Sequence, residues 1–310
     1  MKYKRIQLIA AMVVLTAVIA GCGKSQSGDE TSVQEQTKDG FQGEWIVDAE
    51  YAASKVGKEG TLFVDARGEG PAVLGTMEGA IATSWRDWSI AEGNPGDEKW
   101  GCIQEPEVLA QTLGSLGISK DKEIIFIGET STGWGDDARL LWQLRAAGYT
   151  NVKMIDGGIK ALKAHGLITQ FMASAPEQAE VEIEEIDYTH VMTTEGLMAN
   201  YDSYKIVDVR TDEEYNGEIL YNEAKGGHLP GAIHIRYTDM FKEDGTLKSN
   251  DELTKMFEDA GLSKEDSIVA YCTGGIRSAY TQLVMEMCGF ENSYNYDQSF
   301  WRWAVIGEVE

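Results

Sequence analysis

The residues with the clearest potential for chemistry form one short segment around Cys272. Residues 272–278 read CTGGIRS and follow an apolar run at residues 268–271. We expect a strand to end there and a helix to begin just after the loop, so that backbone amides and the positive end of the helix dipole face Cys272. Arg277 adds a permanent positive charge. All three features favour thiolate over thiol, so Cys272 is predicted to be a nucleophile, with Arg277 as its catalytic partner.

The rest of this loop is predicted to bind the substrate. The predicted binding residues are Thr273, Gly274, Gly275, Ile276 and Ser278. A buried cysteine that only packs is the alternative, but two glycines and an arginine suit an anion better than a core. Four residues separate Cys272 from Arg277, one fewer than in cysteine phosphatases, and the tighter ring favours a single terminal sulfur over a phosphate.

The elements that must position this loop occur twice in the chain. Four pairs of segments match in the same order, 62–67 with 205–210, 78–81 with 230–233, 116–125 with 260–269, and 147–151 with 288–292. Segments that recur in one order indicate an internal duplication. The sequence therefore predicts two copies of one structural unit.

Each copy alternates short apolar runs with helical patterns. Strands are expected at 62–64, 124–127, 152–155, 206–209 and 268–271, and helices at 108–116, 138–147, 252–260 and 278–287. Buried strands that alternate with helices predict an α/β fold in which each copy is an open parallel sheet flanked by helices. Ligands bind at the carboxyl ends of such strands, so sites are expected just after Ile127 and just after Tyr271.

The first 22 residues have the zones of an export signal. A basic start precedes an uncharged stretch at residues 6–20, which is short for a membrane span, and Ala20-Gly21-Cys22 closes it. This ending resembles the bacterial lipobox, in which the cysteine becomes the lipidated first residue. We therefore expect an extracytoplasmic protein that is anchored to the bacterial cell membrane by lipid on Cys22.

These patterns divide the chain into five parts. The predicted boundaries are 1–22 for the lipoprotein signal peptide, 23–43 for a flexible tether, 44–170 for the first copy, 171–187 for a linker and 188–310 for the second copy. The tether is predicted because residues 23–43 are polar and have no apolar period.

The second copy resembles the rhodanese domain. The matching motifs are VDVR at 207–210, EEY at 213–215, GHLPGAI at 227–233, YCTGGIR at 271–277 and YDQSFWRW at 296–303. The resemblance implies two tandem rhodanese-like domains, of which the second is catalytic. It also implies a sulfurtransferase whose Cys272 takes a sulfane sulfur from a small anion such as thiosulfate or 3-mercaptopyruvate. The resulting persulfide would pass that sulfur to a thiol or a cyanide-like acceptor, with ping-pong kinetics.

One position departs from the well-known two-domain members of that family. Those enzymes carry an arginine that helps to hold the anionic donor, and Glu214 stands at that position here. The loss removes an attraction for an anion and can add a repulsion. Arg236, near the expected end of a neighbouring strand, is the candidate for the missing charge and for donor binding, with a plain surface position as the alternative.

The first copy lacks the nucleophile. The repeat places Gly128 opposite Cys272, and the loop that follows is acidic, three residues longer and without cysteine. This domain is therefore predicted to be non-catalytic, with Trp134 either as a wall of the cleft or as an ordinary packing residue.

Composition narrows the remaining possibilities. A net charge of −24 repels phosphate backbones, so nucleic acid is not expected as a partner. The four cysteines and four histidines show no metal-ligand spacing, and we expect no metal or organic cofactor. Cys288 is expected in the core, and Cys102 is expected to be structural or, alternatively, a resolving thiol for Cys272. A cysteine-based phosphatase or arsenate reductase, or a non-catalytic sulfide-binding module, remain as alternative functions.

Overall fold

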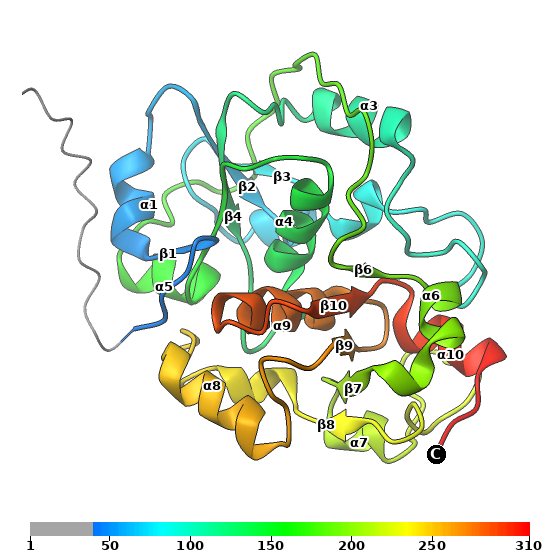
Figure 1. Ribbon diagram of the computed structural model, residues 1–310. Coiled ribbons are helices and arrows are strands. Elements are labelled where there is room, and N and C mark those ends of the chain that lie inside the picture. Colours follow the sequence, from blue (N-terminus) through cyan, green and yellow to red (C-terminus); the bar gives the residue numbers. More distant parts are fainter. Residues whose placement is uncertain (1–39) are drawn as a thin grey trace, which may run out of the picture. The chain divides into compact units, whose positions relative to one another are not determined.

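Two parallel five-stranded sheets organise the part of the chain that the computed structural model describes, residues 40–310 (Figure 1). The strand order is β1-β5-β4-β2-β3 in the first sheet and β6-β10-β9-β7-β8 in the second. The strands are β1 Ile46–Val47, β2 Thr61–Asp65, β3 Ile81–Ala82, β4 Glu123–Ile127, β5 Val152–Ile155, β6 Val191–Met192, β7 Lys205–Asp208, β8 Ile233–His234, β9 Ile268–Tyr271 and β10 Ser293–Tyr296. The equivalent strand orders confirm the predicted duplication and the α/β class.

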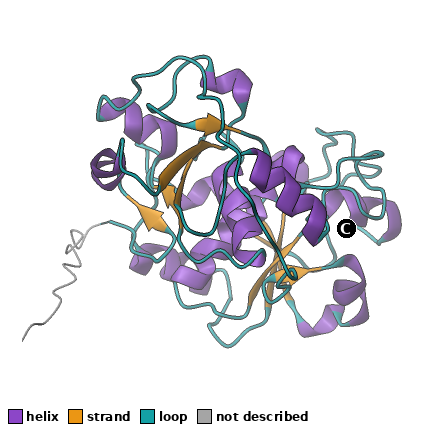
Figure 2. Cartoon of the chain, turned by 90° about the horizontal axis from the view of Figure 1, so that it is seen from above, coloured by secondary structure: helices purple, strands orange, loops and turns teal. Residues whose placement is uncertain are grey.

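Helices surround both groups of strands, as the view from above shows (Figure 2). They are α1 Ala49–Lys55, α2 Glu69–Ala72, α3 Pro106–Ser115, α4 Asp136–Ala146, α5 Gly158–Ala164, α6 Thr194–Ala199, α7 Asp212–Tyr215, α8 Asn250–Asp259, α9 Ile276–Met287 and α10 Ser299–Ile306. The helices and strands expected from the apolar periodicity all lie at the predicted places, within a few residues.

Alternation along β4 explains why helices cover both faces of the first sheet. All five residues of this strand are buried. Ile124 and Phe126 belong to a core cluster that also contains residues of α3 and α4. Ile125 and Ile127 belong to a second cluster, with residues of α1 and α5. Successive side chains of a strand point to opposite faces, so a strand that is buried along its whole length needs a helix layer on each side.

The two halves share one core. Helices α4 and α9 pack against each other, and the cluster on that side runs from the first sheet to the second (Figure 1). Residues 40–310 accordingly belong to a single compact unit. This contact brings the loop before α4 and the loop before α9, the two positions where sites were expected, to the same region of the molecule.

The predictions of the export signal, of lipid on Cys22 and of most of the tether concern residues 1–39, which lie outside the described residues. Within residues 40–310 no helix is both long and apolar enough to cross a bilayer. The stretch between α5 and β6 that includes the predicted linker contains no helix. The predicted domain boundaries themselves stay predictions.

Candidate active site

Cys272 lies where the sequence places it, directly after β9 and before α9. Gly275 is the N-cap residue of α9 and has a φ of 79°, in the left-handed region that favours glycine. Gly274 lies so close to the Trp301 ring that a Cβ at this position would overlap it. The two glycines thus let the chain turn sharply and let an aromatic ring cover the loop. Cys272 itself is 2% exposed.

The loop stabilises the thiolate form of Cys272. Burial alone would raise the pKa of the thiol, but the charge of Arg277, the amide and hydroxyl of Ser278, and the amide of Gly274 together lower it below its ordinary value. The Ser278 Oγ lies 3.6 Å from the Cys272 Sγ and 2.6 Å from the Asn295 Oδ1. Helix start, loop amides and arginine therefore act in the direction that the sequence predicts.

Arg277 lines the pocket at Cys272, but its guanidinium has a partner that the sequence does not indicate. Its guanidinium donates two hydrogen bonds of 2.8 Å to the carboxylate of Glu214 and one to the Thr273 Oγ1. Arg277 is 7% exposed and Glu214 is fully buried. Burial raises the pKa of Glu214, but the Arg277 pair and Thr273 outweigh it and hold the pKa at about 2. The residue expected to repel a donor is thus the ionised partner of Arg277.

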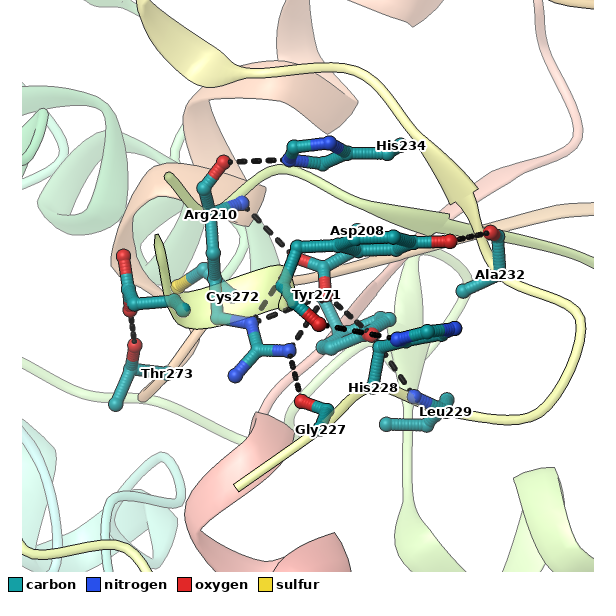
Figure 3. A network of polar contacts seen from close by, with 12 residues as sticks. Asp208, Arg210, Gly227, His228, Leu229, Ala232, His234, Tyr271, Cys272 and Thr273 are labelled. Carbon is teal, nitrogen blue, oxygen red and sulfur yellow. Dashed lines mark hydrogen bonds and ion pairs between the residues drawn. The ribbon is translucent and has the colours of Figure 1, made fainter. Parts of the chain in front are cut away.

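A second buried ion pair supports the strand that carries Cys272 (Figure 3). The Arg210 guanidinium donates to both oxygens of the Asp208 carboxylate and to the carbonyl of Gly227. The hydroxyl of Tyr271, the residue before Cys272, donates to the same carboxylate at 2.5 Å. This network links β7 to the end of β9. In the first copy Arg67 makes the equivalent bonds to Asp65 and to the Gly75 carbonyl.

A small pocket opens on Cys272, with a cavity of about 20 Å³, room for roughly one water-sized group. Its walls are aromatic and apolar, and the lining residues are Trp134, Tyr221, Cys272, Thr273, Gly274, Ile276, Arg277 and Trp301. Trp134 meets Tyr221 edge to face, with ring centroids 5.6 Å apart, and the Trp301 indole donates to the Tyr221 carbonyl. Trp134, from the first copy, is thus a wall of the pocket.

Sequence reasoning missed two of these walls. Tyr221 lies in a long irregular segment between α7 and β8, where no pattern marks it. Trp301 lies in the closing motif 296–303, but the motif does not say what the ring covers. The available signal was the tryptophan-rich end of the chain, which could have been considered as a cover for the Cys272 loop.

Comparison with known proteins identifies the architecture. The model of the rhodanese-like domain matches twice, at residues 48–165 and 193–305. The chain belongs to the rhodanese family. A Haloferax volcanii relative, provisionally named a thiosulfate sulfurtransferase, is 32% identical over 74% of this chain and 80% of its own. A Corynebacterium glutamicum protein named thiosulfate sulfurtransferase is 27% identical over 84% of this chain and 88% of its own. These matches support a rhodanese-family sulfurtransferase.

Solved structures show the same fold. The anaerobic ergothioneine biosynthesis enzyme from Chlorobium limicola superimposes with a TM-score of 0.75 over 86% of this chain and 69% of that chain. The two sequences are 17% identical, so this likeness concerns the fold alone.

The structure does not bring every predicted residue of the second rhodanese domain to the pocket. Thr273, Gly274 and Ile276 line it, whereas Gly275 and Ser278 lie in the adjoining turn and helix start. Arg236 lies elsewhere. Its side chain is 43% exposed and forms ion pairs with Asp212 and Asp239, so its charge is already matched at the surface.

The other described cysteines are unlike Cys272. Cys102 lines a separate cavity next to Asp297, and burial raises its pKa to about 12. Cys288 is buried, as expected, and burial raises its pKa to about 11. Both are free thiols. Among residues 40–310 no group of three or more metal-ligating side chains comes together.

In the first rhodanese domain, a carboxylate stands where the nucleophile would be. A Cβ added at Gly128 would overlap the carboxyl group of Asp137. Asp137 is fully buried, and neither of its carboxylate oxygens has a well-formed hydrogen bond. Burial raises its pKa to about 7, against the opposing effect of the Ala138 amide. The first copy has therefore lost both the cysteine and the space for it.

Proposed function

We propose that this protein is a sulfurtransferase that carries a sulfane sulfur as a persulfide on Cys272. The observation that carries the proposal is the low-pKa thiolate, which faces a cavity with room for roughly one small atom. A thiolate is the reactive form for attack on sulfur, and a persulfide adds one atom at that spot. A tetrahedral phosphate or arsenate needs considerably more room.

The first half-reaction loads the cysteine. With thiosulfate as donor, the Cys272 thiolate attacks the outer sulfur, the sulfur–sulfur bond of thiosulfate breaks, and sulfite leaves with the bonding electron pair. With 3-mercaptopyruvate the carbon–sulfur bond breaks and the product leaves as pyruvate, having taken up the thiol proton. The names of the relatives favour thiosulfate.

The second half-reaction returns the thiolate. A nucleophilic acceptor, such as cyanide or a thiolate, takes the outer sulfur, and the electron pair of the persulfide bond stays on the Cys272 sulfur. The amides of Gly274 and Ser278 stabilise the negative charge that returns to the Cys272 sulfur. The aromatic walls limit access of water to the persulfide.

The test follows the sulfur atom. Purified protein is treated with thiosulfate, and the peptide that contains Cys272 is weighed by mass spectrometry before and after cyanide. The proposal expects a gain of one sulfur atom, its loss on cyanide treatment and an equal amount of thiocyanate. Hydrolysis of an aryl phosphate without sulfur loading would instead favour a phosphatase. Loading without turnover would favour a non-catalytic sulfide-binding module.

The cellular location is a separate proposal that depends on residues 1–22. A basic start, an apolar run and the ending Ala20-Gly21-Cys22 support export and attachment of lipid to Cys22, with the folded part outside the cytoplasm. The catalytic domain would then act on sulfur compounds outside the cytoplasm, next to the membrane.

A further inference from the structure

A buried arginine of the first domain contacts the loop that holds Cys272. Arg139 lies on α4 and is fully buried. Its guanidinium donates to the carbonyl of Gly275 at 3.1 Å, to the carbonyl of Gly101 at 2.8 Å and to the Asp297 carboxylate at 2.5 Å. Arg139 thus connects Gly275 and Asp297, in two segments of the second domain, with Gly101, in a turn of the first domain.

Gly275 is a sensitive point of the loop. It lies between Gly274 and Ser278, the residues whose amides stabilise the thiolate. Its left-handed conformation turns the chain into α9, so a rotation at this residue would re-aim the amides on both sides. A Cβ at Gly275 would also overlap the backbone carbonyl of Asp297 and would lie close to the Arg139 guanidinium. Asp297 and Arg139 therefore contact the loop on the same side.

Within the second domain itself, Asn295 holds the same carbonyl. Its side-chain amide donates to the Gly275 carbonyl at 3.2 Å, and its oxygen accepts from Ser278. Arg139 therefore adds a charged donor to a position that already has a neutral one. A charged donor in a buried site makes the stronger and more directional bond.

A second arginine on α4 allows loop positioning to be separated from domain contact. Arg145 donates two hydrogen bonds, of 2.7 and 2.8 Å, to Glu286 on α9. Like Arg139, it joins the two domains through an ion pair. Its bonds go to the far part of α9 and not to the loop at residues 272–275.

We infer that Arg139 of the first domain is a positioning residue that fixes the sulfur-binding loop of the second domain through Gly275. The non-catalytic domain then completes the active site and does not merely accompany it. The inference rests on the proposed function for the role of the loop. Its structural part is that Arg139 sets the orientation of the amides around the thiolate. This effect can be measured without a sulfur donor.

The test compares the full-length protein with the variants Arg139→Gln, Arg139→Lys and Arg145→Gln. Alkylation of Cys272 by iodoacetamide is followed from pH 5 to 9 by mass spectrometry of its peptide, with thermal melts alongside. We expect Arg139→Gln to move the midpoint of the alkylation profile up by about one pH unit, which slows alkylation about tenfold at pH values well below the midpoint. Arg139→Lys keeps a charge near Asp297 but lacks the planar fork, so it should recover only part of the rate.

Arg145→Gln is the matched control. It should lower the melting temperature yet leave the pH profile of Cys272 alkylation within about twofold of the unchanged protein, an allowance of about 0.4 kcal/mol. If Arg139→Gln does not fold, the profile of Arg139→Lys decides. Folded Arg139 variants with an unchanged profile, or a shift equally large in Arg145→Gln, would overturn the inference. A protein that shows the Arg139 effect but forms no thiocyanate would overturn the proposed function and leave loop positioning intact.

Discussion

The carboxylate of Glu214 and the guanidinium of Arg277 form a buried two-bond ion pair next to Cys272, with both N–O distances at 2.8 Å. This ion pair sets the effect that each of the two charges has on Cys272. Arg277 lowers the pKa of the Cys272 thiol, but part of its field is cancelled by Glu214. Backbone amides therefore also stabilise the thiolate, and Glu214 is a structural partner of the loop.

The two members of this pair should respond differently to substitution. Arg277→Ala leaves the Glu214 charge buried without a partner, so it should cost about 3–5 kcal/mol of unfolding free energy and raise the pKa of Cys272. Glu214→Gln frees the arginine charge and should lower the pKa of Cys272.

Denaturant unfolding and the pH profile of Cys272 alkylation measure both effects. The double variant Glu214→Gln with Arg277→Met removes both charges and should be more stable than Arg277→Ala. The pKa of Cys272 must rise in Arg277→Ala and fall in Glu214→Gln. A pKa of Cys272 that moves the same way in both would contradict this account of the pair.

The buried Asp137 should make stability depend on pH. Its folded pKa, about 7, lies above the ordinary value of 3.8, so the folded state binds more protons between these values. Stability from this group is therefore lost as pH rises from about 4 to 7. Asp137→Asn should flatten that decline and raise the unfolding free energy above pH 7 by about 2–4 kcal/mol. Thermal melts from pH 4 to 8 measure this pH dependence, with Asp202→Asn, at an exposed residue, as the control. Equal slopes of stability against pH in the unchanged protein and in both variants would refute the prediction.

Cys272→Ser should abolish sulfur transfer. A serine hydroxyl is not ionised near pH 7 and cannot carry a persulfide, so thiocyanate formation should fall below detection. Cys102→Ser and Cys288→Ser should keep most of the activity, because burial raises the pKa of both thiols. Substantial thiocyanate from the Cys272→Ser protein would place the chemistry elsewhere.

Trp134→Ala should weaken donor binding without changing the nucleophile. The indole is 44% exposed and meets Tyr221 at the pocket, so its removal should raise the KM for the donor about two- to tenfold, equivalent to about 0.5–1.5 kcal/mol. The pH profile of Cys272 alkylation should keep its midpoint. Phe171→Ala, at a residue that is 73% exposed and does not line this pocket, is the control. An unchanged KM in the Trp134 variant would remove this residue from the binding site.

Cys22→Ala should block lipid attachment. The lipobox-like ending then has no thiol to accept a diacylglycerol, and the protein should appear as an uncleaved precursor or be released from the membrane. Metabolic labelling with a radioactive fatty acid, followed by fractionation, checks this. Equal label on the unchanged and substituted proteins would contradict the lipoprotein proposal.

Local features could be predicted because they depend on neighbours in the chain. The parallel strands follow from short apolar runs, and the position of Cys272 follows from a strand end, two glycines and a helix start. The duplication follows from segments that recur in the same order 141 to 152 residues apart. For these features the sequence alone determined the answer.

Pairings between distant residues required the tertiary structure. Arg277 could have faced a ligand, but packing of α7 against the loop brings Glu214, 63 positions away, to its guanidinium. The same holds for Arg139, which reaches Gly275 across 136 positions, and for Arg236, whose acidic neighbours hold it at the surface. A charged side chain is stabilised by whichever partner the fold brings within hydrogen-bond distance, and no local pattern encodes that partner. The sequence therefore determined the position of Cys272, and the packing of the two domains determined which residues surround it.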